Sequence, residues 1–389
     1  MTINKTLGQT LRFKDDIEVE FGVNSSRSLG EYRSSDPSFD NKSPTGSSLS
    51  NLPLDAGIPT SGQIKFSDFY GKKLNMVVDY FADNVNLTKQ NQGNNTMAAT
   101  WRYQNQSERV KVVGGFRSRP LGSVNNSSNY TMSASDWQGG KKIIVNINQT
   151  IGGKKDGDQS DVALRTGVWP TGTELQVDVG PSGYLTGSGG DGGDAGSAGG
   201  STAGDGGNGT SALGVEYAAN INIASGGAIR CGYAGGGGGS GAANDPSDKS
   251  TTDFGRGGAG GGGGAGRPIG VGGAAGQGGF NGPDPKNGGA GNAGSLSAGG
   301  SGGSGVSHEG ATGGKGGDGG DINDAPQNGT KGARADDRAY RNTPGQEGSA
   351  GSDGKAIYFR SSTIESNSTI DPSNAVDGRA GGKTTGNFN

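Results

Sequence analysis

The recurrence of glycine at every third residue is the feature that most constrains the fold of this chain. The 389 residues include 84 glycines, most of them between residues 185 and 356. They are most regular in the GGx repeat of Gly313–Gly320 and in the series Gly345, Gly348, Gly351 and Gly354. A polyproline-II-type helix has this period and no internal hydrogen bonds. Collagen shares the period, but it needs long uninterrupted repeats rich in proline, and these runs stop after a few units.

A glycine segment of this kind either stays disordered or packs as a bundle. Ordering each glycine costs about 1–2 kcal/mol of backbone entropy, and few apolar groups offset that cost, which favours a flexible linker. The three-residue phase favours the alternative, because backbones without side chains approach closely and their N–H and C=O groups pair between helices. We therefore expect a polyglycine-II helix bundle in residues 185–389, with Asp191, Lys315 and Asp318 facing solvent.

Three apolar phrases with β character flank the glycine runs. They are Leu175–Leu185, Val215–Tyr233 and Ala356–Ile370. The first two lead into glycine runs and the third follows one. We expect a small β platform from which the glycine segments rise and to which they return.

Residues 74–184 predict a β-sandwich-like middle domain, because short alternating or β-branched runs are separated by Asn, Gly, Ser and Pro turns. Trp101, Trp137 and Trp169 are its large core candidates, and the alternative is that they build a carbohydrate-binding face. With residues 1–73 as a separate small module, the predicted fold class is all-β with irregular structure. The predicted strands are Leu74–Phe81, Met97–Tyr103, Arg109–Phe116, Tyr130–Ser133, Lys142–Asn148, Val162–Val168 and Glu174–Val179.

The scarcity of cysteine and histidine argues against several classes of site. Cys231 and His308 are the single residues of their types, so the sequence predicts no disulfide framework, multi-cysteine metal site or histidine-based catalysis. Asp318, Asp321 and Asp324 lie close together, but they lack the spacing of an EF-hand, and a turn is favoured. The sequence predicts no enzyme, no cofactor and no metal.

Charge and hydropathy exclude further classes. The net charge is −3, and the part of the chain after residue 184 carries more acidic than basic groups, which argues against nucleic acid as a partner. Apolar runs stay well short of a membrane span. The residues after Met1 do not resemble an export signal, so we expect synthesis in the cytoplasm without a signal peptide.

Three ordered blocks carry a resemblance to a known module. They are Asp16–Gly22 (DIEVEFG), Ser28–Arg33 (SLGEYR) and Gly57–Gly71 (GIPTSGQIKFSDFYG). Together they resemble the N-terminal module shared by many tailed-phage virion proteins, with Val19 and Gly30 as departures. The resemblance implies virion attachment to other tail or baseplate proteins. The attachment residues that we predict from these blocks are Phe21, Tyr32, Phe66, Phe69 and Tyr70.

The glycine-rich part resembles a second group, the receptor-binding adhesins at the fibre tips of T-even-like phages. The runs Gly235–Gly239, Gly257–Gly264 and Gly313–Gly320 carry this resemblance. It implies a phage tail fibre or tail-tip adhesin that binds an outer-membrane protein or glycan of a bacterium. A non-binding spacer or decoration protein of the virion is the alternative, and an ice-binding glycine-helix protein is a third. Association with further copies of the chain stays open.

Receptor-binding residues are expected where the glycine runs are interrupted, because recognition usually resides in loops on a rigid scaffold. The interruptions are Ala242–Phe254, Arg267–Ile269, Phe280–Asn287 and Asp321–Pro344. The alternative is that these residues clamp the ends of the bundle. The predicted receptor-binding residues are Phe254, Arg267, Phe280, His308, Arg338 and Tyr340.

Overall fold

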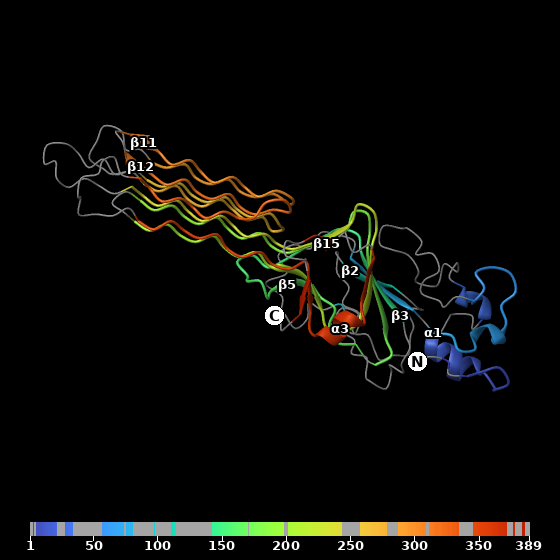
Figure 1. Ribbon diagram of the computed structural model, residues 1–389. Helices are drawn as coiled ribbons and strands as arrows, with labels where there is room; N and C mark the ends of the chain where they lie inside the picture. The colour runs from blue at the N-terminus through green and yellow to red at the C-terminus, as the bar shows by residue number, and fades with distance from the viewer. Residues whose placement is uncertain are drawn as a thin grey trace, which may run out of the picture.

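A computed structural model of the chain shows an elongated molecule with three parts (Figure 1). A small helical module at one end joins a body of β-sheets, and a bundle of extended segments projects from the body. None of the described helices is long and apolar enough to span a membrane. The structure describes residues 3, 5–21, 28–33, 57–73, 75–80, 97, 110–113, 142–169, 171–197, 201–242, 257–277, 287–308, 311–333, 345–371, 376–377 and 383–385.

The N-terminal module consists of short helical turns. A π-helical turn at Phe13–Ile17 continues into α1 (Glu18–Phe21), and two 3-10 turns follow at Leu29–Tyr32 and Phe66–Phe69. Asp68 fixes the last turn by accepting a hydrogen bond from the N–H of Lys65 at 2.7 Å. The apolar residues of the module join the same hydrophobic core as the sheets, so the module packs against the body.

The body is a solenoid of parallel strands distributed over three sheets. The first sheet has the order β14-β9-β6-β3-β1-β2, the second β15-β10-β7-β4 and the third β16-β13-β8-β5. Every described pair in these sheets is parallel except β1 with β2. Successive strands visit the three sheets in turn, so β3-β4-β5, β6-β7-β8, β9-β10-β13 and β14-β15-β16 form successive turns. The strands are β1 (Met76–Tyr80), β2 (Val110–Val113), β3 (Lys142–Ile147), β4 (Thr150–Gly152), β5 (Val162–Arg165), β6 (Glu174–Val179), β7 (Tyr184–Thr186), β8 (Ser211–Val215), β9 (Ala219–Ile223), β10 (Ala228–Arg230), β13 (Ile357–Phe359), β14 (Thr369–Asp371), β15 (Val376–Asp377) and β16 (Lys383–Thr385).

The core of the solenoid consists of inward-facing aliphatic side chains from alternate strand positions. In β3 and β6, residues such as Val145 and Val177 are fully buried, whereas Gln176 and Asp178 point outward. Trp169 is also buried, and its indole N–H donates to the carbonyl of Thr166 at 3.0 Å. A core role for this tryptophan is therefore confirmed, while Trp101 and Trp137 lie outside the described residues.

The predicted β-sandwich is wrong in the described part of the chain. Strands from residues 142–186 pair in parallel with strands from residues 211–385, so the predicted boundary at residue 184 falls within β7. Alternating runs separated by turns look alike in a sandwich and in a solenoid, and only the pairing partners distinguish them. The β-rich class is confirmed, and so are the strands predicted around β1, β2, β3, β5 and β6.

Glycine segments leave the solenoid at one corner, between the second and third sheets. The first excursion connects β7 to β8 through residues 187–210, and the second connects β10 to β13 through residues 231–356. In the turn β3-β4-β5 the connection at the same corner is short, residues 153–161. The expected β platform, from which glycine segments rise and to which they return, is thus confirmed.

Backbone hydrogen bonds between neighbouring segments hold the bundle together with a spacing of three residues. The N–H groups of Gly190, Gly193 and Gly196 donate to the carbonyls of Tyr233, Gly236 and Gly239 at 2.8–3.0 Å. A Cβ on Gly193 would lie 2.1 Å from the carbonyl oxygen of Gly204, so this packing requires glycine. The described segments here are neither helix nor strand, apart from the short β11–β12 pair at the far end (Ser307–His308 and Ala311–Thr312).

Candidate functional site

The far end of the bundle is the candidate functional site, because most connections between bundle segments lie there. The label of β11–β12 marks this end in Figure 1, on the side away from the sheets. The N–H of Gly258 donates to the carbonyl of Gly196 at 2.8 Å, and the N–H of Gly288 donates to the carbonyl of Gly276 at 3.0 Å. Together with the bond from the N–H of Gly196 to the carbonyl of Gly239, these contacts place the segment ends at residues 197, 242, 257, 277 and 287 at the same end.

A small β frame closes this end. β11 and β12 pair antiparallel, and Thr312 also exchanges two backbone hydrogen bonds with Ala333 at 3.1 and 2.8 Å. The Ser240 hydroxyl accepts the N–H of Gly332 at 2.9 Å. The segments that end at residues 242, 308 and 333 are therefore tied to one another at the point where the connecting residues begin.

The predicted receptor-binding residues divide into three groups. Phe254, Phe280, Arg338 and Tyr340 lie outside the described residues. His308 lies in β11 at the far end of the bundle. Arg267 lies at the opposite end, against the solenoid.

Arg267 belongs to a turn that is fastened to the body. Its N–H donates to the carbonyl of Gly187 at 2.9 Å, and its carbonyl accepts from Gly153 at 2.8 Å. The carbonyl of Pro268 accepts the N–H of Gly189 at 2.9 Å. This interruption of the glycine run anchors the bundle to the solenoid, which is the clamping role considered as an alternative in the sequence.

The predicted interruption Asp321–Pro344 is also divided by the structure. Residues 321–324 form a turn near the body, and residues 325–333 return as a bundle segment, with Thr330 N–H bonded to the carbonyl of Lys315 at 2.8 Å. Residues 334–344 lie outside the described residues. The expectation of a single long loop is wrong, because Gly329 and Gly332 continue the three-residue phase.

Carboxylates near this turn accept backbone hydrogen bonds. Asp321 accepts the N–H groups of Asn323 and Asp324 at 2.8 and 2.9 Å, and Asp318 accepts that of Gly302 at 2.8 Å. The favoured interpretation as a turn is thus confirmed. Among the described residues, no group of three or more His, Cys, Asp or Glu side chains is placed to hold a metal ion.

Short polar side chains along the bundle accept backbone hydrogen bonds that were not predicted from the sequence. The sequence predicts that Asp191 and Asp318 face solvent, but both accept backbone N–H groups of a neighbouring segment. Lys315 is exposed as expected. The available signal was the placement of Asp, Asn and Ser at steps of three, as in Asp191, Asp194 and Ser197.

The predicted attachment residues at the other end of the molecule are brought together as an aromatic cluster. Phe21, Tyr32 and Phe69 are fully buried and contact one another edge to face, with ring centroids 5.7–6.0 Å apart. Phe66 is 43% exposed and contacts Phe13 at 6.2 Å. Phe21, Tyr32 and Phe69 are therefore core residues of the module, whereas Phe66 is accessible at its surface.

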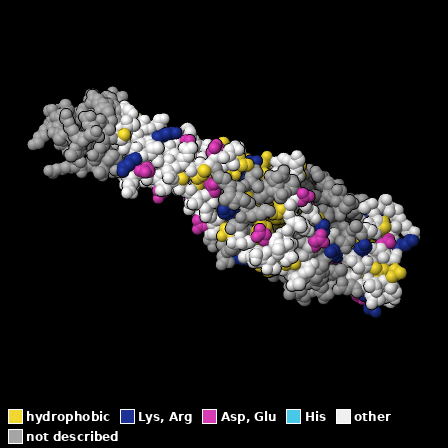
Figure 2. Space-filling view, in the orientation of Figure 1, with side chains coloured by type: hydrophobic (Ala, Val, Ile, Leu, Met, Phe, Trp, Pro, Cys, Tyr) yellow, Lys and Arg dark blue, Asp and Glu magenta, His cyan; other side chains and the backbone are white. Residues whose placement is uncertain are grey.

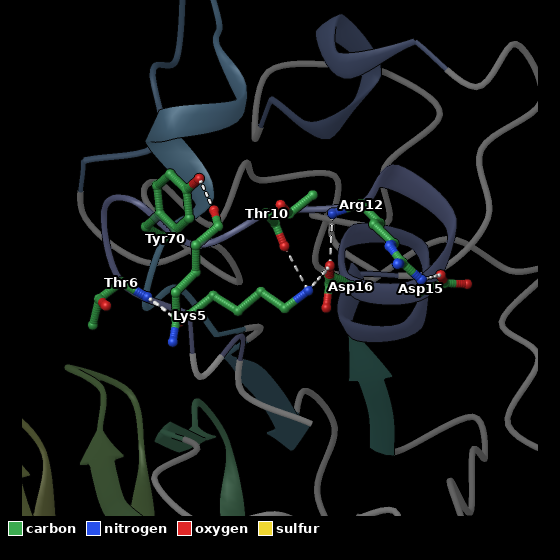
Figure 3. Close-up of polar contacts among 8 residues, drawn as sticks. Lys5, Thr6, Thr10, Arg12, Asp15, Asp16 and Tyr70 are labelled. Atoms are coloured by element: carbon green, nitrogen blue, oxygen red, sulfur yellow. Dashed lines mark hydrogen bonds and ion pairs between the residues drawn. The ribbon is translucent and has the colours of Figure 1, made fainter.

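Polar contacts fix the chain around this cluster (Figure 3). The Tyr70 hydroxyl donates to the carbonyl of Gln9 at 2.5 Å, and Lys5 forms an ion pair with Asp16 at 2.7 Å. Burial alone would raise the pKa of Asp16, but hydrogen bonds from Lys5 and from the N–H of Arg12 outweigh it and lower the pKa. Leu7, in the same turn as Gln9, is 82% exposed, and Figure 2 shows hydrophobic side chains at this end.

Residues 120–387 match the family described as Phage tail fibre adhesin Gp38, and this range covers more than half of the chain. The chain belongs to the Gp38 family of phage tail fibre adhesins. The matched range includes the solenoid from β3 onward and the whole bundle. The adhesin is thus a tail fibre protein of the virion that acts in receptor binding and host attachment.

Two further comparisons accompany this assignment to the adhesin family. A similar solved structure is the crystal structure of the gp37-gp38 adhesin tip complex of the bacteriophage S16 long tail fiber. Its sequence identity is 16%, it covers 86% of this chain and 90% of that chain, and the TM-score is 0.33. No curated protein matches the chain. Residues 1–73 lie outside the family match, so their resemblance to a virion module stays a prediction.

Proposed function

We propose that this adhesin attaches to the virion through residues 1–73 and binds a bacterial surface receptor at the far end of its bundle. The supporting observation is the placement of the two ends. The N-terminal module and the β11–β12 frame lie at opposite extremes of the molecule (Figure 1), as required for a protein that joins a fibre to a cell. An outer-membrane protein or a surface glycan is the receptor class.

The bundle between these ends is of the polyglycine-II type in this proposal. Hydrogen bonds between segments recur every three residues, which is the period of that helix. The bundle segments are held by hydrogen bonds between backbone groups, which leaves them little freedom to move relative to one another. We expect the bundle to act as a rigid spacer between the solenoid and the receptor-binding end.

Receptor contact is assigned to Phe254, Phe280, His308, Arg338 and Tyr340. Aromatic and arginine side chains carry most of the energy in binding interfaces. Arg267 is set apart from this group, because its turn is bonded to Gly153 and Gly187 near the solenoid.

Attachment to another tail or baseplate protein is assigned to the exposed part of the N-terminal module. Phe66 and Leu7 are exposed apolar residues that a partner can cover. Phe21, Tyr32 and Phe69 act indirectly by holding the module together.

Competition for adsorption tests the proposed receptor binding. Purified full-length protein, incubated with susceptible cells, should reduce the adsorption of phage added later. A chain with Arg338→Ala and Tyr340→Ala should compete less well, because the connecting residues lose their cationic and aromatic contacts. A protein that binds no cells at any concentration would favour the spacer function instead.

A further inference from the structure

Short polar side chains on two bundle segments follow one bonding rule. Along residues 191–197, the side chains of Asp191, Asp194 and Ser197 accept the N–H groups of residues 271, 274 and 277 at 2.7, 2.8 and 3.4 Å. Each acceptor lies 80 residues before its donor. The regular step of three on both sides shows that the bonds belong to the lattice of the bundle.

A second series repeats the rule on another pair of segments. Asp205, Asn208 and Ser211 accept the N–H groups of residues 349, 352 and 355 at 2.7, 2.9 and 2.9 Å. Here the separation is 144 residues throughout. In both series the last acceptor is serine and the first is aspartate.

Five of these six side chains, all except Ser197, complete a reciprocal pair of hydrogen bonds of which the backbone supplies only one. The N–H of Ala195 donates to the carbonyl of Ala274 at 3.0 Å, and the Asp194 carboxylate accepts the N–H of Ala274 in return. The backbone carbonyl of Asp194 is engaged elsewhere, because it accepts the N–H of Gly204 at 2.8 Å. The side chain therefore supplies the acceptor that this N–H needs at the edge of the lattice.

We propose that these side chains are positioning residues for the receptor-binding end, a role that rests on the proposed function. The edge segment 270–277 leads directly to the residues that contain Phe280. The edge segment 345–355 begins directly after the residues that contain Arg338 and Tyr340. Bonds to the two acceptor series, together with backbone bonds such as that from the N–H of Gly273 to the carbonyl of Gly261 at 2.8 Å, hold these edge segments to the bundle. They thereby fix the segment ends, residues 277 and 345, next to the connecting residues.

Hydrogen exchange of the full-length protein tests the bonding step. In the Asp194→Ala chain the amide of Ala274 should exchange about tenfold faster, which corresponds to a loss of about 1.4 kcal/mol, within the range of one net hydrogen bond. Asp194→Asn keeps the acceptor oxygen and should restore slow exchange, whereas a merely electrostatic role would not be rescued. Unchanged exchange at Ala274 in Asp194→Ala would overturn the proposal.

Cell binding by full-length variants tests the positioning step. One double variant for each edge segment distinguishes the contribution of segment 270–277 from that of segment 345–355. Asp191→Ala with Asp194→Ala loosens the segment that leads to Phe280, and Asp205→Ala with Asn208→Ala loosens the segment next to Arg338. Weaker binding in at least one double variant, with Asn restoring it in place of aspartate, supports the proposal. Glu347→Ala is the matched control, because Glu347 is exposed on the segment that carries Ser349.

Failure of the positioning role and failure of receptor binding give different experimental results. If both double variants show faster exchange yet bind cells like the unmodified chain, the positioning role is wrong while the receptor site stands. If the unmodified chain binds no cells, receptor binding as a whole fails, whereas faster exchange in Asp194→Ala still supports the bonding step.

Discussion

At the residue scale, Glu216 links the solenoid strands from which the bundle emerges. It follows β8 and accepts hydrogen bonds from Arg165 at the end of β5 and from Arg360 after β13, the latter at 2.6 Å. Its side chain is 6% exposed, whereas the two arginines reach water. Because Arg360 follows the second glycine excursion, this triad joins the chain before the bundle to the chain after it.

Replacement of Glu216 by glutamine should destabilise the body measurably. Two arginines would then face each other without a carboxylate, at a cost of about 3 kcal/mol, the lower end for breaking a buried ion pair because both arginines are partly hydrated. Thermal melting followed by circular dichroism measures the loss. Glu174→Gln is the control, since its ion pair with Lys142 is exposed and should contribute about 0–1 kcal/mol. Equal melting temperatures for the two variants would contradict the assigned role.

The same residue predicts how stability depends on pH. Burial would raise the pKa of Glu216, but hydrogen bonds from Arg165 and Arg360 outweigh it, so the pKa lies below its ordinary value of 4.5. A carboxylate with a lowered folded-state pKa contributes stability above its unfolded pKa and loses it as pH falls through the folded value. The melting temperature should therefore decrease once the pH is lowered beneath about 4.5. In Glu216→Gln this acid-dependent decrease should be smaller, and an identical pH profile would exclude Glu216 as its source.

At the scale of elements, the glycine positions inside the bundle give the most direct test of packing. A Cβ on Gly316 would lie 2.0 Å from the carbonyl oxygen of Gly260, and one on Gly319 would lie 2.2 Å from that of Gly263. Gly316→Val and Gly319→Val should each cost about 1–3 kcal/mol, as overpacking does in a core. Lys315→Ser is the control because Lys315 is exposed. Urea unfolding measures the difference, and equal midpoints would speak for a disordered tract.

The local elements were largely predictable from the sequence, and their partners were not. β6 coincides with the predicted run Glu174–Val179, because alternation of apolar and polar residues is a local signal. β4 was missed because it has only three residues, Thr150–Gly152. The solenoid depends on pairs such as β8 with β13, which lie on either side of the second glycine excursion, and no local pattern specifies so distant a register.

The candidate site was predictable only in part for a similar reason. Two interruptions of the glycine phase, Arg267–Ile269 and the start of Asp321–Pro344, do mark turns, but phase alone does not tell which end of a bundle a turn occupies. Arg267 therefore entered the receptor group although its turn contacts the solenoid. The edge acceptors were missed because an aspartate at a third position has the same sequence pattern whether it faces water or a neighbouring N–H.

At the scale of the whole molecule, the surfaces that we propose for attachment and for receptor binding lie at opposite ends. The exposed apolar residues Leu7 and Phe66 belong to the module at one extreme, and His308 belongs to the frame at the other (Figure 1). Damage to one function should therefore leave the other intact.

Two full-length variants test this separation in phage. Leu7→Ser with Phe66→Ser removes exposed apolar surface from the module, so the protein should be missing from purified virions while the isolated chain still binds cells. Arg338→Ala with Tyr340→Ala should give the reverse, with normal incorporation and slow adsorption. Immunoblots of virions and adsorption rates measure the two properties.

A third variant controls for the loss of apolar surface as such. Ile322→Ser removes an exposed apolar side chain, 38% accessible, from the turn near the solenoid, which belongs to neither surface. It should leave incorporation and adsorption unchanged, because no partner is assigned to that turn. If Ile322→Ser reduces incorporation as much as the module variant does, attachment depends on general solubility or on the body. If the module variant is incorporated normally, residues 1–73 do not attach through Leu7 and Phe66, and the virion partner must contact another surface of the chain.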